Sequence, residues 1–326
     1  MRKRLFCSVL VVLVFAFNLP AQSQQQTKVP KVGRLSSTSL ASGGEREFLG
    51  RELRPLGYVV GKNLVIEFRY ANNKLDRLSA LAEELVGLKV DVIVVGTTPG
   101  ALAAKNATRT IPIVFFGVTD PIAVGLIDSL ARPGGNITGL TDISTVLAGK
   151  RLELLKETVP KVSRVAVLWD PQNPGAARDW KESQLVAREL GLQLHSMAVS
   201  SADKYAGAFK EAIKARSGAL AVAGHSLAVA NQKQIAELAI KNRLPAIYHR
   251  GDFVASGGLM SYGPDQGKLE RRVAAMIDKI LKGTKPADIP VEQPMRFEFL
   301  VNLKAAKQIG LTVPPNLLVR AQKVIR

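Results

Sequence analysis

The sequence is poor in cysteine, histidine and aromatic residues. Its 326 residues include one cysteine and three histidines, and aromatic side chains make up 6% of the chain. A single cysteine cannot form an intramolecular disulfide, and so few cysteines and histidines exclude a structural zinc cluster. No basic stretch interleaves with aromatic residues, which argues against a surface that stacks nucleic-acid bases. We therefore expect no metal and no nucleic-acid partner.

Apolar residues are plentiful by contrast. Hydrophobic residues make up 47% of the chain and charged residues 22%. A disordered chain would contain fewer apolar residues, so this composition indicates a globular protein. The length suits two domains of about 130–150 residues each, or one large α/β unit.

The N-terminus has the features of a secretory signal peptide. Residues 1–4 (MRKR) are cationic, residues 5–17 are apolar, and the small residues Ala21 and Ser23 follow a helix-breaking proline. The apolar run is shorter than the roughly 20 residues that a membrane-spanning helix needs. We expect residues 1–23 to be removed and the protein to be periplasmic. The alternative is an uncleaved helix that anchors the chain.

The chain carries a large excess of positive charge. Lys and Arg number 45 against 27 acidic residues, a formal net charge of +18. Removal of residues 1–23 takes away three basic residues and the only cysteine, Cys7, and lowers the net charge to +15. Outside the cytoplasm, such a charge suits anionic lipid head groups, cell-wall polymers or an acidic docking surface.

Short apolar runs alternate with amphipathic helical runs from Lys31 to about Ile280. Many of the short runs are apolar at consecutive positions, as strands covered on both faces must be. The strand series starts again near residue 160, which predicts two α/β lobes with parallel sheets. The predicted strands are residues 31–35, 64–68, 90–95, 111–116 and 137–140, then 164–168, 192–199, 219–223 and 245–248.

The segment after Gly258 is too short to form a domain and must return to one of the lobes. We expect the first lobe to comprise residues 29–145 and about 257–290, and the second lobe to comprise 146–256 and about 291–326. A chain that crosses between lobes more than once forms a hinge with a cleft.

The loops that follow the predicted strands are polar and rich in small residues. Ligands of open parallel sheets bind beyond the carboxyl ends of the strands, so these loops hold the candidate ligand-binding residues. The candidates are Ser36, Ser37, Thr97, Thr98, Asp120, Asn173, His225, Ser226 and Asp252.

Two of these loops suit the two ends of an amino acid. Thr98-Pro99 and Asp120-Pro121 each place a capping oxygen before a proline at a first helical position. The helix that opens at Pro99 offers free N–H groups to a carboxylate, aided by the hydroxyls of Thr97 and Thr98. Asp120 suits an ammonium group. The plainer alternative is that both are helix caps, worth about 1 kcal/mol each.

The other candidates also have ordinary alternatives. Asn173 suits a hydrogen bond to a ligand from the second lobe, but asparagine between prolines is common in turns. Ser36 and Ser37 serve as turn formers as readily as ligand contacts. Asp252 suits either a second polar contact or a helix cap.

One motif approaches that of a serine hydrolase. Gly224-His225-Ser226 follows a predicted strand, but the final glycine of the nucleophile elbow is missing. A hydrolase would also need His249 within hydrogen-bond reach of Ser226. We therefore expect no catalytic residues and no cofactor.

Several longer motifs extend over the chain after the signal peptide. They are GKNL at 61–64, SLARPGGNITGL at 129–140, GGLMSYG at 257–263, ILKGTKPADIPVEQP at 280–294 and NLKAAKQIGLTVPP at 302–315. With these motifs the sequence resembles the substrate-binding protein family of ABC transporters that includes tryptophan/tyrosine-type periplasmic binding proteins.

The resemblance implies a type I periplasmic-binding-protein fold, with two Rossmann-like lobes joined by a hinge of three crossovers and a small polar ligand in the cleft. It also implies delivery of that ligand to a membrane permease powered by a cytoplasmic ATPase. Relatives of known ligand class resemble receptors for aromatic amino acids, which suits Thr97 and Thr98 for the carboxylate and Asp120 for the amino group. We expect a monomer. The alternative is a sensory binding protein for a membrane signalling partner.

Overall fold

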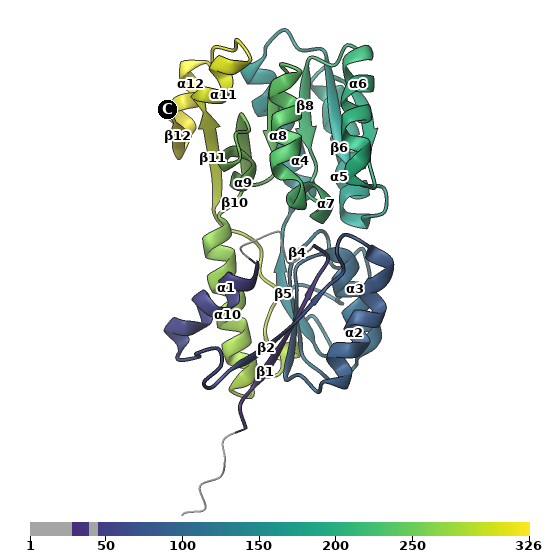
Figure 1. Cartoon of the computed structure of the whole chain (residues 1–326), viewed down its shortest axis with the longest axis vertical. Coiled ribbons are helices and arrows are strands. Elements are labelled where there is room, and N and C mark those ends of the chain that lie inside the picture. Colours follow the sequence, from purple (N-terminus) through teal and green to yellow (C-terminus); the bar gives the residue numbers. More distant parts are fainter. Residues whose placement is uncertain (1–27, 39–44) are drawn as a thin grey trace, which may run out of the picture.

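The computed structural model describes residues 28–38 and 45–326. The predicted signal peptide, residues 1–23, lies outside the described residues. Within the described part, no helix has the length and the apolar character that a membrane crossing requires. Figure 1 shows two lobes, one above the other, each built on a sheet that helices cover on both faces. The predicted two-lobed α/β architecture is therefore confirmed.

The first lobe, the lower one in Figure 1, holds a five-stranded parallel sheet. Its strands, in sheet order, are β2 (Val65–Tyr70), β1 (Lys31–Ser36), β3 (Val92–Val95), β4 (Ile113–Val118) and β5 (Ile137–Thr141). Its helices are α1 (Glu45–Leu53), α2 (Leu78–Gly87), α3 (Thr98–Ala107) and α10 (Gln266–Leu281), with short 3-10 helices η2 (Arg54–Leu56), η3 (Leu75–Arg77) and η5 (Pro286–Asp288).

Two apolar cores lie on the two faces of this sheet. Helices α2 and α3 cover one face, and α1 and α10 cover the other. The helical spacing of apolar residues predicted α10, and all five of its pattern residues are buried: Leu269, Val273, Met276, Ile277 and Ile280. Burial of these side chains is the main source of stability for such a helix.

The second lobe holds a seven-stranded sheet in which only β10 and β11 pair antiparallel. Its strands, in sheet order, are β12 (Lys323–Ile325), β11 (Phe297–Asn302), β10 (Met260–Pro264), β9 (Ala246–Tyr248), β8 (Ala219–Val222), β6 (Arg164–Trp169) and β7 (Gln193–Ala198). Its helices are α4 (Ser144–Thr158), α5 (Pro174–Glu189), α6 (Tyr205–Lys214), α7 (Ser226–Ala230), α8 (Gln232–Lys241), α9 (Gly251–Ala255), α11 (Leu303–Gln308) and α12 (Pro315–Arg320), with the 3-10 helix η4 (Ala202–Lys204).

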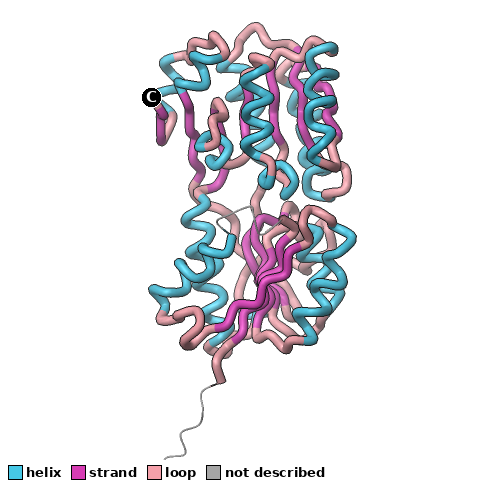
Figure 2. Tube along the Cα trace, in the orientation of Figure 1, coloured by secondary structure: helices cyan, strands magenta, loops and turns pink. Residues whose placement is uncertain are grey.

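The helices of this lobe also cover both faces of the sheet. Helices α4, α5, α11 and α12 contribute to one apolar core, and α6, α7, α8 and α9 contribute to the other. Figure 2 shows the strands of both lobes enclosed between helices.

All nine predicted strands are confirmed, with ends that differ by at most two residues. Strands β10, β11 and β12 were not among the predicted strands. The sequence of β11, FEFLVN, carries a glutamate and an asparagine and is only partly buried, so it lacks the continuous apolar run that marked the other strands.

In the described residues the chain passes between the lobes at three places. It leaves the first lobe between β5 and α4, returns between β10 and α10, and leaves again before β11. The crossings lie side by side: the N–H of Thr141 donates to Glu292 O (2.9 Å), and the N–H of Asp265 donates to Arg296 O (3.2 Å). These backbone bonds tie the crossing segments into one hinge.

The expected lobe boundaries differ from the structure at the second crossing. We expected residues 257–290 in the first lobe, but β10 (Met260–Pro264) belongs to the sheet of the second lobe, where it pairs with β9 and β11. The return to the first lobe therefore comes near Asp265. At the third crossing, Glu292 still bridges to Leu140 of β5, so the first lobe extends slightly beyond residue 290.

Candidate functional site

A cavity lies between the two lobes, at the carboxyl ends of the parallel strands. Its empty space is about 880 Å³, part of it open to solvent. Ligands of open parallel sheets bind at this edge. The lining residues are Thr38, Gly96, Thr97, Thr98, Phe116, Gly117, Thr119 and Asp142, then Arg151, Asn173, Gly224, His225, Ser226, Val229, His249, Arg250, Pro264, Gln266 and Leu269.

Four helices begin at this cavity. Thr97 caps α3, and its hydroxyl accepts the N–H of Gly100 at 3.3 Å. Asn173 caps α5, and His225 caps α7. Gln266 is the first residue of α10. Each helix start directs N–H groups and a partial positive charge outward, so this arrangement favours a ligand with a negatively charged group.

Charged side chains of both signs line the cavity. The carboxylate of Asp142, just beyond β5, accepts hydrogen bonds from the Thr119 hydroxyl at 3.0 and 3.1 Å. Arg151 of α4 is only 4% exposed, and its Nε donates to Tyr262 O at 2.8 Å. Burial lowers the pKa of Arg151, while the nearby carboxylates of Asp179 and Asp142 oppose that shift. The cavity therefore offers one carboxylate to a cationic group of a ligand.

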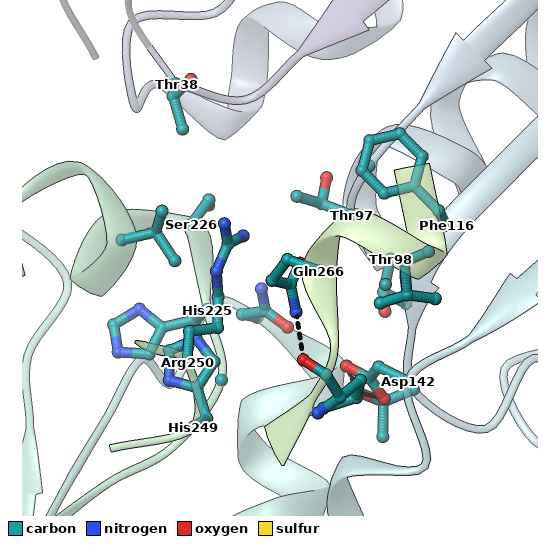
Figure 3. Close-up of a pocket in the computed structure, with 18 of the residues that line it drawn as sticks. Thr38, Thr97, Thr98, Phe116, Asp142, His225, Ser226, His249, Arg250 and Gln266 are labelled. Atoms are coloured by element: carbon teal, nitrogen blue, oxygen red, sulfur yellow. Dashed lines mark hydrogen bonds between the residues drawn. The ribbon is translucent and has the colours of Figure 1, made fainter. Parts of the chain in front are cut away.

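Apolar side chains complete the lining. Phe116, Val229, Pro264 and Leu269 contribute them, and Figure 3 shows Phe116 on the side of Thr97 and Thr98. The guanidinium of the buried Arg34 lies 5.0 Å from the centroid of the Phe116 ring, within the range of a cation–π contact. A ligand with an apolar body finds matching contacts here.

Two histidines on neighbouring strand ends are deeply buried at the cavity. His225 is 4% exposed and His249 is 8% exposed. Burial lowers the pKa of His225 to about 3. Burial also lowers the pKa of His249, and the positive charges of Arg151 and Arg250 lower it further. Both imidazoles are therefore neutral at pH 7.

Five of the predicted ligand-binding residues line the cavity: Thr97, Thr98, Asn173, His225 and Ser226. Several of them also cap helices, which is the alternative role that the sequence allowed. The Asn173 side chain accepts the N–H groups of Gly175 (2.9 Å) and Ala176 (3.2 Å), so it is a helix cap as well as a lining residue.

Two other predicted residues lie behind the lining. The Ser37 hydroxyl lies 2.7 Å from Thr97 Oγ1, and the Ser36 hydroxyl lies 3.0 Å from Thr38 Oγ1. Both serines therefore contact residues that line the cavity instead of lining it themselves.

The predicted acidic residues are paired with arginines. Asp120 is not among the lining residues; its carboxylate lies 2.8 Å from an Arg178 nitrogen and accepts the N–H of Ala123 at 3.1 Å. Asp252 lies 2.6 Å from Arg250 Nη2. Since Asp120 follows β4 and Arg178 lies on α5, the first of these ion pairs joins the two lobes.

Sequence reasoning missed several lining residues, including Phe116, Asp142, Arg151, Arg250 and Gln266. The rule used for the other strand ends would have found Asp142, which directly follows β5. Arg250 lies two residues after Tyr248, the last residue of β9, so the same rule would have found it. Arg151 lies inside a helix, where the sequence does not distinguish a buried arginine from an exposed one.

Ser226 and His249 both line the cavity, as a hydrolase would require. No hydrogen bond between them is present in the described part of the chain, where the His249 ring bonds to the backbone of Val222. Nor do residues 28–38 and 45–326 bring three or more potential metal-ligating side chains together.

Comparison with known proteins gives a consistent result. The sequence matches, over residues 45–325, the model of a family described as ABC transporter substrate binding protein. It is similar to a tyrosine-binding protein of Clostridioides difficile (strain R20291), with 29% identity over 261 residues, 80% of this chain and 75% of that protein. The structure resembles that of the ABC domain in complex with L-Trp from Streptococcus pneumonia, with 27% identity, a TM-score of 0.82, and 91% of this chain and 99% of that chain covered.

A third relative is less similar in structure. The ligand-free, open structure of a substrate binding protein with adhesive properties from Clostridium difficile has 26% identity and the same coverage, 91% and 99%, but a TM-score of only 0.64. The overall structure of this chain is therefore more similar to that of the L-Trp complex than to the ligand-free, open structure.

Proposed function

This chain belongs to the family of ABC transporter substrate-binding proteins, and on that premise we propose that its ligand is an amino acid. In this proposal the protein is exported to the periplasm by the signal peptide at residues 1–23 and acts as a monomer. It closes its two lobes, which have the type I periplasmic-binding-protein fold, around the ligand. It then delivers the ligand to a membrane permease that a cytoplasmic ATPase drives.

The observation that carries the proposal is the pairing of opposite charges in one cavity. The first turn of α3, with the hydroxyls of Thr97 and Thr98, suits the carboxylate of the ligand. The carboxylate of Asp142 suits its ammonium group. A zwitterion satisfies both, and the apolar lining accepts a side chain. The names of two relatives, a tyrosine-binding protein and a complex with L-Trp, support the same ligand class.

Ligand binding selects the closed arrangement because both lobes contribute contacts. Thr97 belongs to the first lobe and His225 to the second, so a ligand that touches both is bound fully only when the lobes meet. Its differential affinity for the closed form shifts the population toward that form. Micromolar affinity corresponds to about 8 kcal/mol, which one paired zwitterion and an apolar pocket can supply.

Asp142→Asn tests the proposal. The substitution keeps an oxygen for the Thr119 hydroxyl but removes the negative charge, so the amino acid loses a charge-assisted hydrogen bond worth about 1.5–3 kcal/mol. We expect affinity to fall by about ten- to a hundred-fold. A thermal-shift screen of amino acids and small carboxylates identifies the ligand, and calorimetry measures its affinity for both proteins.

Asp120→Asn is the matched control, because Asp120 is the carboxylate that the sequence predicted for the ammonium group. Its ion pair with Arg178 lies outside the lining, so we expect only a small loss of affinity. If instead Asp120→Asn abolishes binding and Asp142→Asn does not, the ammonium group is held at Asp120. If no amino acid binds to the unmodified protein, the proposed ligand class is wrong.

A further inference from the structure

A second cavity lies at the hinge, between the second and the third crossing segments. Its empty space is about 1090 Å³, part of it open to solvent. Its walls come from Leu140 of β5, from α10 with the residue that caps it, and from the segment 292–296 that leads to β11. Figure 1 shows α10 beginning directly below β10, where the two lobes meet. The interlobe cavity described above is a different one, although Leu269 lines both.

Positive charge predominates in this hinge cavity. Its lining includes four basic residues and two acidic ones, an excess of two positive charges (4 − 2). Both acidic residues already have partners within the lining. A carboxylate oxygen of Asp265 lies 3.6 Å from Lys268 Nζ. Glu292 accepts a hydrogen bond from Arg272 Nε at 2.7 Å. The remaining basic residues therefore have no acidic residue of the lining left to pair with.

The two excess charges belong to Arg271 and Arg296. Both side chains are exposed, and neither forms an ion pair or a side-chain hydrogen bond within residues 28–38 and 45–326. Arg271 lies in the second turn of α10, and Arg296 directly precedes β11. The N–H of Asp265 donates to Arg296 O at 3.2 Å, which keeps the start of α10 beside Arg296. One cavity thus gives access to two guanidinium groups that lack a counter-ion.

Apolar side chains lie next to these arginines in the lining. Leu140 and Leu269 contribute apolar surface and are buried, at 2% and 8% exposed. Met295 adjoins Arg296 in the chain and is 88% exposed. A ligand with an apolar part would remove the Met295 side chain from water, which is favourable in proportion to the area covered. The cavity therefore suits an anion that also carries an apolar group.

We propose that the hinge cavity binds an organic phosphate, whose phosphate group contacts Arg271 and Arg296 and whose apolar part covers Met295. A phosphate monoester carries a charge of about −1.5 to −2 at pH 7, which matches the excess of two positive charges. The planar guanidinium group can donate two parallel hydrogen bonds to a phosphate. A monocarboxylate would leave one arginine without a counter-ion, and inorganic phosphate would leave Met295 uncovered. This inference does not depend on the proposed amino-acid ligand.

Calorimetry with phenyl phosphate tests the proposal on the unmodified protein. We expect saturable binding of one molecule per chain. Benzoate has the same ring but a single negative charge, so we expect its affinity to be lower by about ten-fold or more. Inorganic phosphate lacks the ring and should bind about five-fold more weakly. Absence of saturable binding of phenyl phosphate, or an equal affinity for either of the other anions, would overturn the proposed ligand class.

Arg271→Gln and Arg296→Gln examine the two arginines. Each removes one positive charge from an exposed side chain, so we expect the fold to be retained. Each should lower the affinity for phenyl phosphate by about ten-fold or more, because a charge-assisted hydrogen bond is lost.

Lys279→Gln is the matched control for both variants. Lys279 is an exposed residue of α10 and does not line the hinge cavity, so its loss should change the affinity by less than about two-fold. Equal losses in the control and the two arginine variants would indicate general attraction of anions to a basic protein. Unchanged affinity in both arginine variants would mean that phenyl phosphate binds elsewhere. Either result would overturn the proposal.

Vesicles distinguish the two sources of such a phosphate group, a soluble ester and a lipid head group. Phosphatidic acid is a lipid whose head group is a phosphate monoester. Flotation is therefore measured with phosphatidylcholine vesicles with and without phosphatidic acid, for the unmodified protein and for the Arg271→Gln, Arg296→Gln double variant. Flotation that requires phosphatidic acid and both arginines would assign the site to a lipid. Without it, binding of phenyl phosphate that requires both arginines assigns the site to a soluble ester.

Discussion

His225 and His249 are neutral because the chain buries them beside positive charge. His225 is a helix cap that accepts a backbone N–H, and a protonated ring could not do so. His249 lies near Arg151 and Arg250, which both oppose a further positive charge. The unfolded chain offers no such restraint, and there a histidine takes up a proton near pH 6.5.

This difference predicts that the folded state loses stability in acid. The pKa of His225 is about 3 in the folded protein, below the unfolded value of about 6.5. Between these values the unfolded state binds the proton and the folded state does not, so the free energy of unfolding falls as pH falls. The fall is about 1.4 kcal/mol per pH unit for each such histidine.

Denaturant titrations between pH 7.5 and pH 4.5 measure this slope. His225→Asn removes one titrating group and keeps a capping oxygen, so its slope should be smaller by up to one proton. Identical slopes for the two proteins would show that His225 takes up its proton equally in the folded and unfolded states.

At the scale of elements, α5 shows how a single side chain positions a helix start at the cavity. Asn173 is 5% exposed and accepts two backbone N–H groups in the first turn of α5. Within the same turn, Gly175 lies so close to Thr119 that a Cβ atom there would be 2.9 Å from the Thr119 hydroxyl oxygen. The first turn of α5 is thus in contact with the opposite lobe.

Asn173→Ala should affect both stability and binding. Loss of the cap leaves two N–H groups without their acceptor and should lower the free energy of unfolding by about 1–2 kcal/mol. Because the α5 start also lines the cavity, we expect ligand affinity to fall too. Asn173→Asp retains a capping oxygen and should keep most of the stability, which thermal unfolding of both variants will show. Equal losses of stability in both variants would mean that loss of the capping oxygen does not cause the destabilisation.

A helix or strand could be predicted where its own sequence indicates which of its residues are buried. The first nine strands have apolar runs, and α10 has apolar residues at helical spacing, so local pattern was sufficient. The segment that forms β10 was assigned to the wrong lobe, because its residues indicate burial but not which sheet they join. Its neighbour β9 is the partner, and pairing of that kind depends on the whole fold.

The candidate site was predictable in part for the same reason. Thr97, Asn173 and His225 follow strands directly and start helices, so a local rule finds them. Asp120 satisfies that rule as well, yet its carboxylate turns to Arg178. A rule based on position along the chain cannot include a partner that lies 58 residues away in the other lobe.

In the whole molecule the two lobes are in contact, and an ion pair outside the cavity helps to keep them so. Asp120 and Arg178 face one another across the lobes with a nitrogen–oxygen distance of 2.8 Å, and their side chains are 33% and 40% exposed. An ion pair with this exposure is worth about 0.2–1 kcal/mol and weakens as salt is added. It therefore adds a modest bias toward the closed arrangement.

Arg178→Gln should shift the molecule toward the open arrangement. We expect a larger radius of gyration in small-angle X-ray scattering without ligand, and ligand affinity lower by about two- to five-fold. Lys150→Gln is the matched control, because it removes a similar ion pair, with Glu153, that lies within α4. The bias is absent if the two variants scatter alike and bind alike.

The ion pair between Asp120 and Arg178 involves no residue that lines the cavity, so it also favours the closed arrangement when no ligand is bound. A ligand-free receptor in the closed arrangement would present the same outer surface to a transporter as a ligand-bound one. It would compete with the ligand-bound receptor for the transporter. The rate of uptake would then depend on the ratio of ligand to receptor, and an excess of receptor would lower it.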